Sequence, residues 1–357
     1  MKKIFIIICL LILTACGGNK PNEIEENNTK MQKYEIQFFE AFDTVTTFQI
    51  YDTDEKTANE KLEKMRNEYF RLHREFDRYN NYENLNNLKI INDNAGVQPV
   101  EVSDDLYNLI ETTLEREKTI SNKVNIAMGP IIDIWAKYRE AHLDGGEAEA
   151  IKQFGHPLPE REELEALRNL TDTTKIKTDK KTKTIYIEKG MKLDLGAVAK
   201  GYATEKIGEY AKQIGVKSGL ISAGGNVKLI GKHPIKETYT VAIQNPNDKG
   251  DNSTFLAVLN LNDTSVVTSG DYQRYFEYNG RKYHHIIDPK TLYPEGEYNS
   301  ISIITKDSGL SDYLSTTLFL STEDEIKKIS EEQDVEVIWN TLSGELKETG
   351  HMLEGEE

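Results

Sequence analysis

The chain has 357 residues, and its 44 Lys and Arg against 60 Asp and Glu give a formal charge of −16 at pH 7. Hydrophobic residues make up 38% and charged residues 29%, which is typical of a soluble globular protein with one large domain or two. Such a length can bury a core without disulfide or metal cross-links. The acidic balance argues against general nucleic-acid binding, because it repels phosphate backbones.

The first sixteen residues have the pattern of a bacterial lipoprotein signal. Lys2 and Lys3 precede ten apolar residues at 4–13, a run too short to span a membrane but suitable for a signal-peptide core. The segment Leu13–Cys16 is similar to a lipobox, with cleavage before Cys16 and lipid on its sulfur. We expect a signal peptide at 1–15, a lipidated Cys16 that begins a polar tether over 16–33, and anchoring on the extracytoplasmic face of the cell membrane. The alternative is an ordinary signal peptide with an incidental cysteine.

Cysteine chemistry is excluded from the mature domain. The chain contains only Cys9, which leaves with the signal, and Cys16, which is acylated. The remaining body therefore has no catalytic thiol, disulfide or cysteine metal site.

The pattern of the first half predicts two strands within 34–51 and amphipathic helices. A break at 41–43 separates the two strands, and Ser103 is positioned to cap a helix. Charged residues with Pro and Gly over 140–172 indicate loops with one short helix. The expected elements are helices over 54–77, after 103 and within 161–170, and a hairpin over 175–189.

The second half mixes strands and helices without regular alternation, which indicates an α+β fold. A helix over 197–214 should end at Gly215. We expect one compact unit with two lobes over 34–350, followed by a polar tail over 351–357. The other predicted elements are strands at 218–223, 226–231, 239–244, 254–261, 273–278, 281–287 and 299–305, helices at 309–320 and 323–332, and a hairpin at 335–348.

Two candidate sites lie at turns. In the segment 193–201 a strand is expected to end at Asp194 and a helix to begin after Gly196, so helix amides and Lys200 could bind an anion. The alternative is a plain turn in which Asp194 caps the helix. The segment 222–226 contains two glycines that let a ligand approach the backbone, although ordinary hairpins contain the same pair.

Two further candidates carry carboxylates, hydroxyls and histidines. The segments 268–276 and 283–289 place a carboxylate, an arginine, His284 and His285 close together in sequence. Adjacent histidines on a strand point to opposite faces, so they are poor joint metal ligands. Asp312 and Thr316 share a helix face, and their oxygens suit a hard cation such as Mg²⁺, unless they simply form a solvated face.

Common enzyme motifs are missing. The sequence contains no G-x-S-x-G elbow, Walker lysine loop, H-E-x-x-H or G-x-G-x-x-G. Ordinary hydrolase, nucleotide triphosphatase and Rossmann interpretations lose their support.

In their order along the chain, these clusters resemble the ApbE family of FAD:protein FMN transferases. LDLGAVAKGYA, SAGGN, VAIQNP, VTSGDYQRYF with HHIIDPKTLYP, and SDYLSTTLF are similar to the family motifs over about 42–319. Asp43 and Leu292 stand where the family has glycine, and Asn125 and Asn226 stand where it has aspartate. The resemblance implies a single ApbE-like, T-fold-like domain with mixed, mainly antiparallel sheets and packed helices.

The resemblance also implies roles for particular residues. Members bind FAD and Mg²⁺, transfer the FMN half to a threonine hydroxyl of an acceptor flavoprotein, and release AMP. Catalytic roles would fall to His285 and Asp312, and the metal would be held by Asp312, Thr316 and the carbonyl of Ala197. The flavin and adenine contacts implied are Phe42, Tyr79, Val124, Asn125, Asp194, Lys200 and Ile286.

Two other functions remain open at this stage. With water as acceptor, the same site would be an FAD pyrophosphatase that yields FMN and AMP. A flavin-binding lipoprotein without chemistry is the third possibility, although pure binding does not require a metal on the diphosphate.

Overall fold

The protein is described here from a computed structural model, which covers residues 30–246, 254–272 and 274–353. The expected signal peptide, Cys16 and nearly all of the expected tether lie outside these residues, as does the end of the polar tail. Among the helices of these ranges, none combines the length and apolar composition that crossing a bilayer requires.

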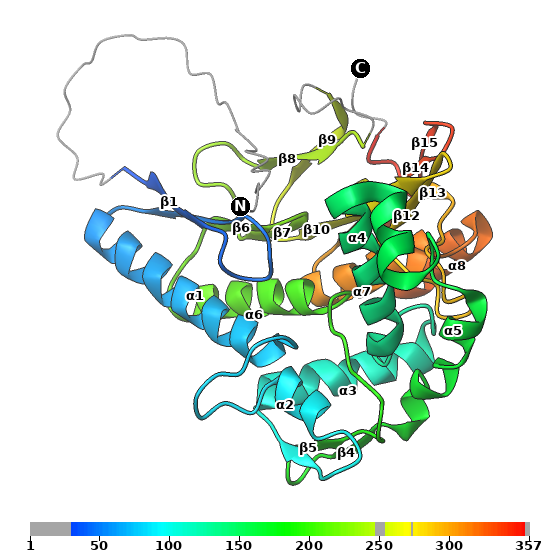
Figure 1. Ribbon diagram of the computed structural model, residues 1–357. Coiled ribbons are helices and arrows are strands. Elements are labelled where there is room, and N and C mark those ends of the chain that lie inside the picture. Colours follow the sequence, from blue (N-terminus) through cyan, green and yellow to red (C-terminus); the bar gives the residue numbers. More distant parts are fainter. Residues whose placement is uncertain (1–29, 247–253, 273, 354–357) are drawn as a thin grey trace, which may run out of the picture.

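An eight-stranded antiparallel sheet is the centre of the fold (Figure 1). Each neighbouring pair of strands in it is antiparallel. Its order is β1 (Gln32–Phe38), β2 (Thr46–Asp52), β6 (Gly219–Ala223), β7 (Asn226–Ile230), β10 (Ser265–Gly270), β13 (Tyr298–Thr305), β14 (Glu336–Thr341) and β15 (Leu346–Glu348).

Three helices cover one face of this sheet: α1 (Glu55–Phe76), α6 (Ala199–Gln213) and α7 (Ser308–Phe319) (Figure 1). The predicted apolar stripe of α1 is confirmed, since Leu62, Met65 and Tyr69 are buried against the sheet. Helix α8 (Glu323–Gln333) follows α7 and begins with a capping box at Thr322. The helices bury the main core against the sheet.

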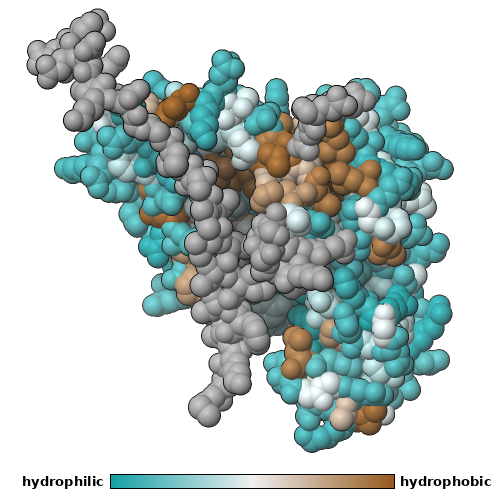
Figure 2. All heavy atoms as spheres, turned by 90° about the horizontal axis from the view of Figure 1, so that it is seen from above, coloured by the Kyte–Doolittle hydropathy of each residue, from teal (hydrophilic) through white to brown (hydrophobic). Residues whose placement is uncertain are grey.

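A separate hairpin, β8 (Tyr239–Gln244) with β9 (Phe255–Leu261), lies over the opposite face (Figure 1). Tyr239 and Leu259 pack there against Val266 and Ile304 of the sheet. Figure 2 views the molecule from this side and shows hydrophobic side chains gathered on a surface that is otherwise mostly hydrophilic.

The second lobe is mainly helical and continues the same core. Its helices are α2 (Leu88–Asp93), α3 (Asp104–Thr119), α4 (Gly129–Phe154) and α5 (Arg161–Glu165), followed by two short 3₁₀ turns (Arg168–Leu170, Thr173–Lys175). A small sheet has the order β3 (Val100–Glu101), β5 (Thr184–Tyr186) and β4 (Lys177–Asp179). The lobe also contains the hairpin of β11 (Tyr275–Tyr278) and β12 (Arg281–His284). The predicted α+β class with mainly antiparallel sheets is confirmed.

Three local predictions were wrong. Helical structure in α4 reaches Phe154 where loops were expected, because the chain resumes a helix after the non-helical backbone at Gly145 and Gly146. Strand β10 was missed, although it lies between β7 and β13. No strand ends at Asp194, and the helix cap is Val198; Asp194 instead accepts a hydrogen bond from Gly196 N at 2.8 Å within the turn.

Asp43 and Leu292, at which the family resemblance implies glycine, have a left-handed backbone with φ of 51° and 62°. We expect opposite results from substituting glycine at the two positions. Asp43→Gly should be neutral or stabilise by up to about 1 kcal/mol, because Asp43 is exposed and only the strain is removed. Leu292→Gly should destabilise by about 2–4 kcal/mol, because Leu292 is fully buried. Urea unfolding of both variants measures the difference, and equal shifts would contradict this explanation.

Candidate functional site

Asp312 is a buried carboxylate at the contact between α7 and α6. It is 6% exposed, and its Oδ2 accepts a hydrogen bond from Gly201 N at 2.7 Å. Gly201 belongs to the first turn of α6, where backbone amides have no partner within the helix. Asp312 therefore satisfies one of these amides and places negative charge at the positive end of the helix dipole.

Glycine at 201 is required for this contact. A Cβ there would lie 2.3 Å from Asp312 Cβ and 2.4 Å from the Ser308 carbonyl oxygen. Since real Cβ atoms do not approach backbone so closely, any side chain at 201 would push α7 away from α6. Close packing of α6 against α7 thus explains why the motif has glycine between Lys200 and Tyr202.

Lys200 and Asn226 complete the surroundings of Asp312. Burial raises the pKa of the Asp312 carboxyl, while the Lys200 charge, the Gly201 amide and Asn226 act in the opposite direction. Burial likewise lowers the pKa of Lys200, which Asp312 opposes. The buried Asn226 Nδ2 has no hydrogen bond of standard geometry with the described residues, although it lies close enough to act on Asp312. The site therefore contains an unpaired donor beside a desolvated carboxylate.

The donor set fits a hard cation that shares a substrate. Thr316 lies one turn after Asp312 on α7, and Ala197 lies one turn before Gly201. Among the described residues, neither the Thr316 hydroxyl nor the Ala197 carbonyl has a hydrogen-bond partner. Carboxylate, hydroxyl and carbonyl oxygens are ligands that suit Mg²⁺. The described ranges contain no group of three or more His, Cys, Asp or Glu that could hold a metal.

The four sequence clusters meet around this point. Ser269 Oγ of β10 lies 2.8 Å from Ser315 Oγ of α7. The turn at Gly224 and Gly225 has φ of 53° and 94°, which is the backbone of a two-residue hairpin. This turn is also joined to β10, since Thr268 N donates to Gly225 O at 3.1 Å. Pairing in the central sheet, which the sequence does not display, brings these segments together.

His284 and His285 face different environments, as expected from adjacent positions. His284 is 8% exposed, its Nδ1 accepts from Ile286 N at 3.2 Å, and its ring meets Phe319 edge-on. Both histidines line a small cavity together with Trp135 and Arg139, but only the side chain of His285 is exposed to solvent. His285 is therefore the histidine that is open to a substrate.

The pKa of His285 is lowered, first by the surrounding protein and then by Arg274 and Lys200. Although water still reaches the ring, the neighbouring cations disfavour its protonated form. The ring is neutral at pH 7 and can accept a proton.

His284 should make the fold sensitive to acid. Burial, followed by Arg281 and Lys282, lowers the pKa of His284 from 6.5 to about 4. The unfolded chain then binds a proton that the folded chain does not, so the free energy of unfolding should fall as pH decreases from about 6.5 to about 4. The expected loss is about 3 kcal/mol. His284→Asn keeps an acceptor for Ile286 N and should remove this part of the pH slope in urea unfolding; an unchanged slope would contradict the assignment.

Comparison with known proteins identifies the family. The model of the ApbE family matches residues 42–339. The chain belongs to the ApbE family.

Named relatives and solved structures of the ApbE family agree with this. An FAD:protein FMN transferase of Klebsiella pneumoniae (strain 342) is 32% identical, over 72% of this chain and 75% of the relative. One from Haemophilus influenzae is 27% identical over 82% of each. The crystal structure of the ApbE protein of Thermotoga maritima superimposes with a TM-score of 0.76 at 25% identity, covering 88% of this chain and 96% of that one. The flavin transferase ApbE of Vibrio cholerae has a TM-score of 0.71 at 19% identity, which supports the fold.

Membership of the ApbE family makes the chain a transferase that acts on flavin, with FAD as its substrate. The interpretations as a pyrophosphatase or a non-catalytic flavin-binding protein are therefore less well supported. The predicted roles of single residues are a separate matter, and they rest on the geometry of this chain.

Two of the residues of this chain that were predicted to contact flavin lie on loops beside the site. The ring of Phe42 packs against Tyr69, and its backbone N donates to His73 Nδ1 at 3.2 Å. Tyr79 is 65% exposed, and the guanidinium of Arg78 lies over its ring at 5.3 Å. Both rings are accessible enough to contact a ligand.

The other predicted flavin contacts are more strongly engaged with the protein. The Asp194 carboxylate is paired with Arg78, which also pairs with Asp133. The Asn125 amide accepts from Ala127 N at 2.7 Å and donates to Thr171 O at 2.8 Å. Val124 and Ile286 are buried, with exposures of 2% and 5%. In this conformation these four residues shape the loops of the site, and their backbone atoms remain the candidate contacts.

The sequence reasoning missed two arginines. Arg274 donates to the Asp43 carbonyl at 3.4 Å and acts electrostatically on both Lys200 and His285. The guanidinium of the partly buried Arg139 on α4 forms neither an ion pair nor a hydrogen bond with any described residue. Burial, then Arg274, lowers the pKa of Arg139. Arg139 lies on α4, just before the stretch 140–172 that was expected to be mostly loop, and no sequence signal connected it with His285.

Proposed function

We propose that this ApbE protein carries out Mg²⁺-dependent transfer of the FMN moiety of FAD to a threonine hydroxyl of an acceptor flavoprotein, with release of AMP. The observation that carries the proposal is the buried Asp312 carboxylate on the Gly201 amide, with Lys200 beside it and Thr316 one turn further along α7. This arrangement suits a diphosphate bound together with a divalent cation.

The reaction exchanges one phosphorus–oxygen bond for another. The threonine oxygen attacks the phosphorus of the FMN half, the bridging bond of the diphosphate breaks, and AMP leaves. When bound, Mg²⁺ would neutralise charge on the phosphate oxygens, and Asp312, Thr316 and the Ala197 carbonyl would hold it. Lys200 supplies further positive charge. A chain with a net charge of −16 does not attract an anionic substrate through its overall field, so positive charge is needed at the site itself.

His285 is the group available to accept the threonine proton. It is neutral at pH 7, open to solvent, and close enough to Lys200 and Arg274 for both charges to affect its pKa. A phosphate dianion on those cations would offset their charge and raise the pKa of His285, which makes it a better base in the complex.

We also propose that the enzyme works outside the cytoplasmic membrane, held by lipid on Cys16. The support is the lysine pair, apolar run and Leu13–Cys16 segment at the N-terminus. Its acceptors would then be redox proteins exposed on that side of the membrane.

Mass spectrometry tests the proposed reaction. FAD, Mg²⁺ and acceptor flavoproteins of several types are incubated with the domain from residue 30 onward, and each acceptor is weighed. A gain of one FMN mass that maps to a threonine, with equimolar AMP, is expected. AMP without any modified acceptor would instead indicate a pyrophosphatase, and intact FAD would indicate binding alone.

Arg139 should strengthen binding of the substrate phosphates. It is an unpaired cation on the cavity wall next to His285, where a dianionic ligand would pair with it. Arg139→Ala should weaken FAD binding by about tenfold, and added salt should reduce the difference. The exposed Lys137 lies on the same helix, so Lys137→Ala is the matched control. Fluorescence titration of FAD measures both variants, and equal affinities would contradict the role of Arg139.

A further inference from the structure

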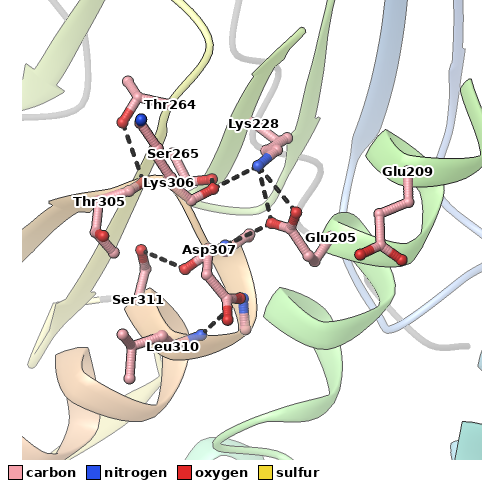
Figure 3. A network of polar contacts seen from close by, with 12 residues as sticks. Glu205, Glu209, Lys228, Thr264, Ser265, Thr305, Lys306, Asp307, Leu310 and Ser311 are labelled. Carbon is pink, nitrogen blue, oxygen red and sulfur yellow. Dashed lines mark hydrogen bonds and ion pairs between the residues drawn. The ribbon is translucent and has the colours of Figure 1, made fainter. Parts of the chain in front are cut away.

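A buried lysine of the central sheet takes no part in the chemistry described above. Lys228 of β7 is 4% exposed, and its ammonium group lies 3.0 and 2.9 Å from the two carboxylate oxygens of Glu205 on α6 (Figure 3). The same group donates to the Lys306 carbonyl at 2.5 Å. Burial of an ammonium is unfavourable unless its donors are satisfied, and here a carboxylate and a carbonyl satisfy them.

Through Glu205 this ion pair reaches the beginning of α7. Glu205 Oε2 accepts a hydrogen bond from Ser308 N at 2.7 Å, and Ser308 is the first residue of α7. The next amides of α7 are capped by Asp307, whose Oδ1 accepts from Gly309 N and Leu310 N. Glu205 therefore binds an amide that the side-chain cap does not use.

Helices α6 and α7 are thus joined by two hydrogen bonds that are one helical turn apart. In the first, Gly201 N donates to Asp312 Oδ2, and in the second, Ser308 N donates to Glu205 Oε2. Each helix contributes two residues separated by four positions, which lie on the same face. A sliding of α7 along α6 would break both bonds together.

The surroundings of Lys228 are shaped for this arrangement. Gly208 of α6 leaves room for the lysine stem, because a Cβ there would lie 3.3 Å from both Cγ and Cε of Lys228. The chain before α7 is also held, since the Thr264 hydroxyl donates to the Thr305 carbonyl at 3.0 Å (Figure 3). The ion pair thus has fixed partners on α6, on β7 and on the segment that enters α7.

We propose that Lys228 and Glu205 are positioning residues that hold the Asp312 carboxylate on the Gly201 amide and thereby preform the metal and phosphate site. The proposal rests on the proposed function for the role of Asp312. Stability alone does not account for the pair, because buried ion pairs are often replaced by apolar residues without loss of stability. A requirement for one register between α6 and α7 does account for it.

Lys228→Met and Glu205→Gln test the proposal, with Lys61→Met as matched control. Lys61 of α1 also bonds a carboxylate, Asp52 at 2.8 Å, and a backbone carbonyl, Gly215 at 3.2 Å, but this contact is at the C-terminal end of α6, away from Gly201. Hydrogen exchange of the Gly201 amide reads the contact without any ligand. In Lys228→Met we expect this amide to exchange on the order of 10- to 100-fold faster, and in the control we expect no change.

The second measurement is the Mg²⁺ concentration for half-maximal transfer, taken together with FAD affinity in the absence of Mg²⁺. In Lys228→Met the Mg²⁺ concentration for half-maximal transfer should rise about tenfold, while the FAD affinity without Mg²⁺ changes less than about twofold. Lys228→Arg should restore most of the Mg²⁺ response, and it carries the test if the methionine variant does not fold.

Gly201 protection at the wild-type level in both Lys228→Met and Glu205→Gln would overturn the proposal. Equal changes in Lys228→Met and Lys61→Met would overturn it too, because they would indicate general loosening of α6. If the wild type transfers FMN without Mg²⁺, the metal part of the proposed function fails. Faster exchange at Gly201 in the variants would still support the positioning role in that case.

Discussion

Asp312→Asn should reduce the rate of FMN transfer by about 10³-fold at saturating FAD, because the variant loses the charge that would bind the metal. The asparagine oxygen can still accept the hydrogen bond from Gly201 N, which Asp312 Oδ2 accepts at 2.7 Å. The fold should therefore persist. The rate of FMN gain by an acceptor, measured by mass spectrometry across a series of Mg²⁺ concentrations, checks this.

Glu75→Gln is a suitable control for Asp312→Asn. Glu75 is also a buried carboxylate, at 3% exposure, but it is engaged with Arg71 and Ser103 at the contact between α1 and α3. Burial raises the pKa of Glu75, as it does that of Asp312. The control should lose stability without losing its Mg²⁺ response. An Asp312→Asn enzyme with wild-type activity would remove Asp312 from the metal site.

His285→Gln should slow transfer by about 10²–10⁴-fold and leave FAD affinity within about threefold, because a base acts only in the chemical step. Glutamine keeps hydrogen-bonding capacity but cannot take up the proton of the threonine hydroxyl. Single-turnover transfer and fluorescence titration of FAD separate the two quantities. Equal losses in rate and affinity would make His285 a binding residue.

The pH dependence gives a second test of His285. Surrounding protein and nearby cations lower its pKa in the free enzyme, so the imidazole should titrate well below its usual range near 6.5. Binding of FAD neutralises Arg274 and Lys200, so the pKa should rise in the complex. The transfer rate should fall as pH decreases through that higher value, because protonated His285 cannot accept a proton. An NMR titration of the ring with and without FAD measures both values, and an upward shift is required.

Local patterns in the sequence were sufficient for most of the elements. The apolar stripe of α1, the Ser103 cap of α3, the end of α6 at Gly215 and the hairpin of β4 and β5 all depend on neighbouring residues, and the structure has each of them. The exceptions have local causes as well. The part of helix α4 after residue 140 was missed because its glycine pair is typical of a loop. Strand β10 was missed because only its second half, from Thr268, stands out in the sequence, and there as candidate site residues.

The sequence by itself determined the residue types of the site: a carboxylate and a hydroxyl one turn apart, a lysine in the first turn of a helix, and adjacent histidines that must face opposite ways. Only the tertiary structure decided which groups meet. The contact of Asp312 with Gly201, the choice of His285 as the open histidine, and the approach of Arg139 and Arg274 all join segments that are distant in sequence. Such contacts follow from the order of strands and the packing of helices, which depend on the burial of the whole core and not on any local pattern.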